Sequence, residues 1–525
     1  MKKNSSSLLI VFVCLLHLSI SCQNIKKEGI KATTKNEPQY SQSFDSLSIA
    51  PFFKKHPAFQ KYQKEVVTLY QQQEYNFIWF DSKGVKEIGY LLYNKASNLT
   101  SEGISTTLPY RKQLDAIFQE ESNDSSPNTE SELLISCMYM YYSAKVFTGL
   151  PVEKRTELGW YLPRKKLAVI TYLDSILVNP SLINEDEKEI SGQYYRLREQ
   201  LKKYRTLEQK EWSPIVLDLK KTDIKIGDSI PEIAIIRNRL YLFGDLDSDS
   251  KSNVYDANLA EGINRYIIRN GLAPTTSLSK QLLSHLNISI ASRMKTIIVN
   301  MERWRWFASP IVRDKRFVFI NIPSYQLRYF EIGKPLLESK VVVGKSVHKT
   351  VVFSAPMKYI VFSPYWNVPT SIVKKEILPA IEKNPNYLSQ HNMEWNKGGI
   401  RQKPGPKNAL GRVKFIFPNS KAIYLHDTPS KSVFNQEKRA FSHGCIRLEK
   451  PKELAQLILK NDPHWTHEKI EKAMNSTIEK WYALPQPIPV YIGYFTAWVT
   501  KDGTIHFYDD VYQRDNRLAR LLLEE

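Results

Sequence analysis

The sequence predicts a multidomain α+β protein. We expect a helical scaffold, then a small mainly helical domain, then a β-rich domain. Three observations lead to this prediction. Apolar residues recur at three- and four-residue steps between about 46 and 222, which is typical of amphipathic helices. Residues 223–294 combine a polar loop with a helix that has clear start and stop signals. From about residue 295, β-branched and aromatic residues gather in short runs typical of strands.

The composition excludes several classes of protein. A chain of 525 residues and 61.0 kDa corresponds to roughly three or four domains. Hydrophobic residues make up 42% and charged residues 24%, which excludes a collagen, a coiled-coil rod and a mostly disordered chain. Four cysteines are too few for a disulfide scaffold, and the sequence has no uncharged apolar run long enough for a polytopic membrane protein. The net charge of +20 favours polyanionic neighbours: nucleic acid, an anionic membrane or an acidic polymer.

The N-terminus has the pattern of an export signal, so we assign residues 1–21 to a signal peptide. A basic start precedes an apolar run of 13 residues (8–20), which is too short to span a bilayer. Cys22 follows in a setting that resembles a bacterial lipoprotein cleavage box, although Leu18 lies four residues before it rather than three. We therefore expect a periplasmic or cell-envelope protein, lipid-anchored through Cys22, with a plain cleaved signal as the alternative. Export argues against a nucleic-acid partner, and the polar residues 22–45 form a predicted flexible tether.

Residues 46–222 are predicted to form a helical scaffold domain without a chemical cluster. Its two clearest helical faces are made by Phe59, Tyr62, Val66 and Leu69, and by Leu134, Cys137, Met138 and Tyr141. The second face places Cys137 among apolar residues, so we expect a buried, inert thiol there.

Residues 223–294 are predicted to be a separate small domain. A helix over 256–269 ends at Asn270-Gly271, a typical helix stop. The stretch IRNRLYLFGD…YDANLAEGINRYIIRNGL resembles the three-helix peptidoglycan-binding domain. It departs from that family at Arg265 and Tyr266, where a bulky hydrophobic pair is more usual, and an unrelated helical linker is the alternative.

Residues 295–480 are predicted to be the β-rich domain, with residues 481–525 as a C-terminal hairpin and tail. The elements expected are a strand at 316–322, a hairpin over 325–344 that turns at Gly333, a strand at 423–425, a helix over 452–460 after Pro451, and a second hairpin that turns at Asp502-Gly503.

The residues that carry chemistry lie within 423–450. His426 follows a predicted strand, and Cys445 comes 19 residues later in the run Ser442-His443-Gly444-Cys445. A nucleophilic thiol needs a base for its proton and N–H donors for the oxyanion. We expect His426 to be the base and to lower the pKa of the thiol, and the N–H groups of Gly444 and Cys445 to be the donors.

Three alternatives compete with a reactive thiol. Cys445 could be a structural thiol, although its Ser-His-Gly-Cys setting is polar. His426, His443 and Cys445 could ligate zinc, although no Cys-x-x-Cys or His-x-His pair supplies a fourth ligand. Cys445 could form a disulfide with Cys137. The order of the chain, with the His before the Cys, differs from that of papain-like proteases.

A His followed after about 15 residues by Ser/Thr-His-Gly-Cys resembles the signature of the L,D-transpeptidases. The stretches SPYWNVPTSI, RQKPGPKNALGRVKFIFPN and IYLHDTP are similar to the large periplasmic branch of that family. The resemblance implies a β-rich catalytic domain with a cap over 370–411, which we expect to be a mobile surface loop after a short helix. The residue roles that it implies are Cys445 as nucleophile, His426 as general base and acid, His443 and Gly444 in the active-site turn, and Tyr424, Arg447 and Trp366 in substrate binding.

The resemblance also implies an activity, namely 3→3 cross-linking of peptidoglycan stem peptides through a cysteine thioester, with neither metal nor organic cofactor. An L,D-carboxypeptidase, a wall-protein attachment enzyme and a non-catalytic lipoprotein that anchors to peptidoglycan remain alternatives. The group that orients His426 stays open. Asp427 is adjacent, but neighbouring side chains on a strand face opposite ways, so a backbone carbonyl serves equally well.

Overall fold

The computed structural model describes residues 42–119, 128–163, 168–184, 192–218, 224–272, 277–307 and 314–523. The predicted signal peptide, Cys22 and most of the tether lie outside these residues. No helix within the described residues is long and apolar enough to cross a bilayer.

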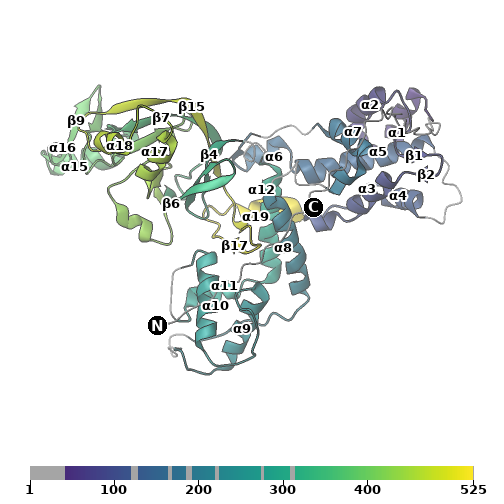
Figure 1. Cartoon of the computed structure of the whole chain (residues 1–525), viewed down its shortest axis with the longest axis horizontal. Coiled ribbons are helices and arrows are strands. Elements are labelled where there is room, and N and C mark those ends of the chain that lie inside the picture. Colours follow the sequence, from purple (N-terminus) through teal and green to yellow (C-terminus); the bar gives the residue numbers. More distant parts are fainter. Residues whose placement is uncertain are drawn as a thin grey trace, which may run out of the picture. The chain divides into compact units, whose positions relative to one another are not determined.

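The N-terminal part is helical, as predicted (Figure 1). Its helices are α1 (Ile49–Lys55), α2 (Gln63–Gln72), α3 (Glu87–Ser97), α4 (Arg111–Phe118), α5 (Thr129–Ser143), α6 (Val152–Glu157), α7 (Val169–Val178) and α8 (Gly192–Glu208), with a small hairpin of β1 (Phe80–Asp81) and β2 (Gly84–Val85). Helix α5 is buried along nearly its whole length, and its N-cap is Asn128, whose side chain accepts a hydrogen bond from the Ser131 N–H. Cys137 lies fully buried in α5 as a free thiol, as expected.

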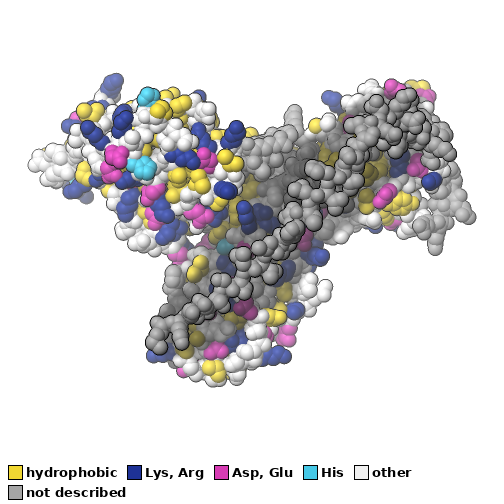
Figure 2. All heavy atoms as spheres, viewed as in Figure 1, with side chains coloured by type: hydrophobic (Ala, Val, Ile, Leu, Met, Phe, Trp, Pro, Cys, Tyr) yellow, Lys and Arg dark blue, Asp and Glu magenta, His cyan; other side chains and the backbone are white. Residues whose placement is uncertain are grey.

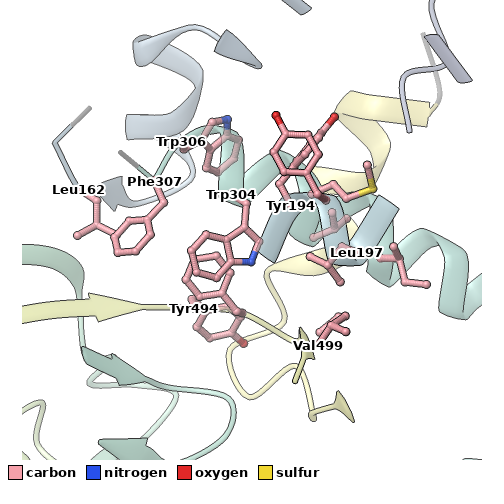
Figure 3. Close-up of a cluster of buried hydrophobic side chains, with 14 of the residues drawn as sticks. Leu162, Tyr194, Leu197, Trp304, Trp306, Phe307, Tyr494 and Val499 are labelled. Carbon is pink, nitrogen blue, oxygen red and sulfur yellow. The ribbon is translucent and has the colours of Figure 1, made fainter. Parts of the chain in front are cut away.

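The middle of the chain adds α9 (Pro231–Phe243), α10 (Ala257–Arg269), α11 (Lys280–Leu286) and α12 (Ile290–Arg305). Asp256 caps α10, and Asn270-Gly271 ends it as predicted, with Gly271 at φ +65°. The strand pattern expected from residue 295 is wrong for its first part, because α12 continues to Arg305 and the first strand of the β-rich domain begins at Arg316. Trp304 and Trp306, at the end of α12, pack in an aromatic cluster with Phe307 and Tyr494 (Figure 3).

The β-rich part is a sheet that closes on itself. Its strands are β4 (Arg316–Asn321), β5 (Gln326–Glu331), β6 (Lys334–Gly344), β7 (Val352–Phe362), β11 (Val413–Ile416), β12 (Leu425–His426), β14 (Ile446–Leu448) and β15 (Lys480–Gly493). They pair in the order β11-β12-β14-β6-β5-β4-β15-β7, and β7 also pairs with β11, which completes the ring. Strand β13 (Ala440–Ser442) pairs with β6 at the side, and β3 (Trp160–Tyr161) pairs with β7.

Two strands cross the domain boundaries expected from the sequence. Strand β15 pairs with both β4 and β7, so the sheet continues past residue 480. Strand β3 belongs to the N-terminal part but extends the same sheet. The remaining C-terminal elements are α17 (Pro451–Leu459), α18 (His467–Met474), the predicted hairpin of β16 (Ala497–Val499) and β17 (Ile505–Phe507), and α19 (Asp515–Leu523).

The segment expected to be a mobile cap loop is folded. Within 370–411 it contains α14 (Thr370–Ile372), a π-helical turn (Val373–Ile377), α15 (Leu378–Lys383), α16 (Tyr387–Gln390), β9 (Met393–Asn396) and β10 (Gly399–Gln402), and β8 (Trp366–Asn367) precedes it. The three strands form their own sheet in the order β8-β10-β9. A separate small core of Val368, Val373, Ile377, Met393 and Ile400 holds these elements together. Gly and Pro residues therefore mark turns between short elements here, rather than a loop without structure.

Candidate active site

The predicted site residues come together on two neighbouring strands. Strands β12 and β14 run parallel, with His426 opposite Arg447 in the register. The Ile446 N–H donates to the Tyr424 carbonyl just before β12, so the pairing extends back to Tyr424 and Cys445. Side chains alternate along a strand, which puts these four residues on one face of the sheet. Leu425, Ile446 and Leu448 are fully buried in the main core and occupy the other face.

The backbone carbonyl of Asp427 orients the His426 ring. The distance from His426 Nδ1 to the Asp427 O is 2.5 Å, so Nδ1–H donates and Nε2 carries the free lone pair. The Asp427 carboxylate is turned elsewhere: it accepts from Lys431 Nζ at 2.7 Å and from the Arg412 N–H at 2.9 Å. The question left open by the sequence is thus answered in favour of the carbonyl.

The His426 ring is neutral at physiological pH. Burial lowers its pKa to about 4, and the positive charges of Arg447 and Lys414 contribute to the lowering. The hydrogen bond to the Asp427 carbonyl works in the opposite direction but does not compensate for burial.

The pKa of the Cys445 thiol is raised, contrary to the expected lowering. Burial raises the pKa of this thiol above its ordinary value, and hydrogen bonds from Tyr424 offset this only in part. The thiol shares a hydrogen bond with the Tyr424 hydroxyl and contacts the Ala422 carbonyl at 3.6 Å. Cys445 is partly exposed and is a free thiol, as is Cys137, so the structure does not contain the alternative disulfide.

The turn before Cys445 is fixed by side-chain hydrogen bonds. Ser442 Oγ donates to the Cys445 carbonyl at 2.6 Å and accepts from the Gly444 N–H at 3.1 Å. Gly444 has φ +119°, a backbone conformation that residues other than glycine rarely adopt. Since its N–H already donates to Ser442, Gly444 shapes the turn and is not a free oxyanion donor, which corrects the role expected for that N–H.

Two residues that the sequence did not indicate stabilise this turn through hydrogen bonds to backbone groups. Thr350 Oγ1 donates to the Gly444 carbonyl at 2.8 Å and accepts from the Gly344 N–H at 2.9 Å. The Tyr512 hydroxyl donates to the Gly344 carbonyl at 2.6 Å and accepts from the Thr350 N–H at 3.1 Å. Thr350 and Tyr512 lie far from the motif in sequence, and no local pattern marks either of them.

We expect Thr350→Val to lower the catalytic activity of this site by about 10-fold and the free energy of unfolding by about 1–3 kcal/mol. The change keeps the shape of the side chain but leaves the buried Gly444 carbonyl and Gly344 N–H without their partner. Chemical denaturation and a steady-state assay measure the two effects. Thr350→Ser keeps the hydroxyl and should restore both; equal activity of the valine and serine variants would contradict the role.

The other predicted residues lie around this centre. His443 is exposed, with Nε2 4.0 Å from Oε1 of Glu376 in the cap. Arg447 Nε is buried, and no hydrogen-bond partner for it exists among the residues described. Trp366 packs against the small core of the cap. Within the described ranges, no three His, Cys, Asp or Glu side chains gather in a way that could hold a metal ion.

Comparison with known proteins identifies two regions of the chain. Residues 315–466 match the family described as the L,D-transpeptidase catalytic domain, and residues 64–201 match the Scaffold domain. A curated protein from Haemophilus influenzae, described as a putative L,D-transpeptidase, is 35% identical over 222 residues. That match covers 38% of this chain and 45% of the relative, so the chain spans under half the length of the curated protein that it matches.

Similar solved structures include an L,D-transpeptidase from Mycobacterium smegmatis, at 15% identity and a TM-score of 0.20, covering 34% of this chain and 58% of that one. Another is an L,D-transpeptidase from Stackebrandtia nassauensis, at 14% identity and a TM-score of 0.22, covering 52% of this chain and 95% of that one.

Proposed function

We propose that this chain, which carries the catalytic domain of the L,D-transpeptidase family together with a Scaffold domain, forms 3→3 cross-links between peptidoglycan stem peptides through a thioester on Cys445. One observation carries the proposal: the register of β12 and β14 gathers Tyr424, His426, Cys445 and Arg447 on one face of the sheet. A thiol and a neutral imidazole on one rigid surface are the nucleophile and the base that acyl transfer through a thioester requires, and Arg447 adds a cation suited to an anionic substrate.

The first half-reaction acylates Cys445. As Sγ attacks the amide carbonyl of the third, diamino-acid residue of a donor tetrapeptide, its proton passes to Nε2 of His426. The tetrahedral oxyanion is stabilised by the Cys445 N–H and the Tyr424 hydroxyl. When the C–N bond breaks, His426 returns the proton to the departing amine of D-alanine. Because both groups start neutral, the thiol loses its proton only as the substrate is attacked.

The second half-reaction transfers the acyl group. The side-chain amine of an acceptor stem attacks the thioester carbonyl, His426 takes its proton, and Sγ leaves and is protonated again. The folded cap belongs to this step, since a covered thioester reacts with an amine before water reaches it. Arg447, whose buried Nε has no hydrogen-bond partner in the described part of the chain, binds a carboxylate of the stem peptide.

The envelope location is part of the proposal. We place the protein in the periplasm, anchored to a membrane through a lipid on Cys22, with the 224–272 and 277–294 region as a peptidoglycan-binding unit. Figure 2 shows Lys and Arg side chains mixed with Asp and Glu on the face displayed, rather than in one patch. The net charge of +20 therefore supports a general attraction to anionic envelope surfaces.

Muropeptide analysis tests the reaction. Purified protein is incubated with disaccharide-tetrapeptide, and the products are separated and weighed by mass spectrometry. Dimers that have lost one D-alanine are expected, together with a transient protein adduct at Cys445. Tripeptide monomers alone would indicate an L,D-carboxypeptidase, and unchanged tetrapeptide without any adduct would indicate a non-catalytic binder.

A further inference from the structure

A lysine lies next to the general base on the side away from Cys445. Strand β11 pairs with β12 so that Lys414 is opposite His426, just as Arg447 is opposite His426 on β14. The three side chains therefore form one row across the site face, with the base between two cations. The positive charges of both Arg447 and Lys414 act to lower the pKa of His426.

The Lys414 ammonium is only partly neutralised by the protein. Its Nζ lies 3.7 Å from Oε1 of Glu479 and 3.5 Å from the Tyr365 carbonyl, and it sits 5.3 Å from the centre of the Trp481 ring. Both oxygens of Glu479 already accept hydrogen bonds, from the Tyr365 N–H and the Trp481 indole N–H, each at 2.8 Å. Burial lowers the pKa of Lys414 in spite of Glu479, so a further anion beside it would be stabilising.

The chemistry of the proposed reaction supplies such an anion. The departing D-alanine carries its carboxylate on the carbon next to the amine, with oxygens about 3 Å from the nitrogen that His426 protonates. Neighbouring strands are about 4.8 Å apart, so a cation one strand beyond His426 lies at the correct spacing for that carboxylate. An acceptor amine binds where the D-alanine amine left. If the carbon that bears this amine also carries a carboxylate, that carboxylate lies beside Lys414 in the same way.

We propose that Lys414 binds the carboxylate next to the departing and the attacking amine. The enzyme therefore favours an amine with an adjacent carboxylate over a simple amine at this position. This assignment rests on the proposed function. It makes Lys414 a specificity residue for the leaving group, separate from Arg447, which faces the donor on the Cys445 side. It also predicts that an acceptor reacts more slowly when the carbon next to its attacking amine carries no carboxylate or an amidated one.

Paired substrates and variants test the assignment. The donor is a tetrapeptide that ends in D-alanine or in D-alanine amide, and the protein is wild type, Lys414→Gln or Lys414→Arg. Wild type should lose about 10- to 100-fold in kcat/KM when the carboxylate is amidated, the range typical of a hydrogen bond between charged groups. With the acid donor, kcat/KM of Lys414→Gln should fall by a similar factor relative to wild type. Amidation of the donor should then change kcat/KM of this variant very little, while Lys414→Arg retains much of the preference for the acid.

Two controls separate this role from a structural one. Lys358, an exposed lysine on β7, is changed to Gln to remove the same charge away from the row, and should leave the acid preference intact. The rate of Cys445 alkylation by iodoacetamide, a neutral reagent, should be nearly equal in wild type and Lys414→Gln. A Lys414→Gln enzyme that keeps the full preference for the acid would overturn the assignment alone. Wild-type protein that consumes neither donor would overturn the proposed function and this assignment with it.

Discussion

Replacing Cys445 with alanine is expected to lower the rate of stem-peptide cross-linking by about 10⁴-fold or more, since removal of a catalytic nucleophile has effects of this size. Without Sγ no thioester forms, and His426 is left without a proton to accept. The measurement is the yield of dimeric muropeptides, with intact protein mass as a second readout. Wild-type protein should gain the mass of one carbapenem at Cys445, and the variant should gain none.

Cys137 provides the matched control. It is fully buried in α5, and burial raises its pKa well above the ordinary value, so it is an unreactive thiol. Cys137→Ala should lower the free energy of unfolding by about 1 kcal/mol, a typical effect for a small core truncation, and leave cross-linking unchanged. Dimer formation by Cys445→Ala would rule out the thioester mechanism, and carbapenem labelling of Cys137 would rule out the assignment of the reactive thiol.

The features of the site that depend on local sequence were predictable. The order His426, then Ser442 to Cys445, identifies a thiol and an imidazole, and the alternation of side chains explains why one face of the paired strands carries the chemistry. The hairpin of β5 and β6 and the turn at Gly503 follow from turn residues at fixed positions. Each of these rests on residues within a few positions of one another.

The features that depend on long-range packing were not predictable. Strand β3 joins a sheet whose other strands begin more than 150 residues later, and no pattern in Trp160 and Tyr161 indicates the partner. The clamp of Thr350 and Tyr512 joins residues 162 positions apart. The pKa of Cys445 likewise depends on burial in the folded protein, and burial outweighs the lowering that a nearby imidazole suggests from sequence alone.

The folded structure of the cap was also not predictable from the sequence. Its Gly and Pro residues correctly indicate turns, but the apolar residues that form its core are few and are spread over more than 30 positions. Val368 and Ile400 come together only because β10 pairs with β8, and two-residue strands such as β8 leave almost no periodic signal. A short structured segment of this kind resembles a loop in sequence.

Replacing His426 with glutamine is expected to reduce cross-linking by about 10²- to 10⁴-fold, the usual contribution of a general base. The pH profile identifies the cause. Because the pKa of His426 is lowered to about 4, its neutral form persists through the whole neutral range, and kcat/KM of wild type should fall only as the pH drops through about 4. An ordinary, exposed histidine would give that fall near pH 6.5.

Stability gives a second, independent signature of the same group. Folded His426 binds its proton only near pH 4, whereas the unfolded chain binds it near pH 6.5, so protonation favours unfolding between these values. The free energy of unfolding should therefore decline more steeply from pH 6.5 to 4 in wild type than in His426→Gln. His464→Gln, at an exposed position, should reproduce wild type in both profiles. If kcat/KM of wild type fell near pH 6.5 and this fall were missing in His426→Gln, His426 would still be the base, but the lowering of its pKa by burial would be contradicted. A variant with wild-type rates would show that another group takes the proton from Cys445.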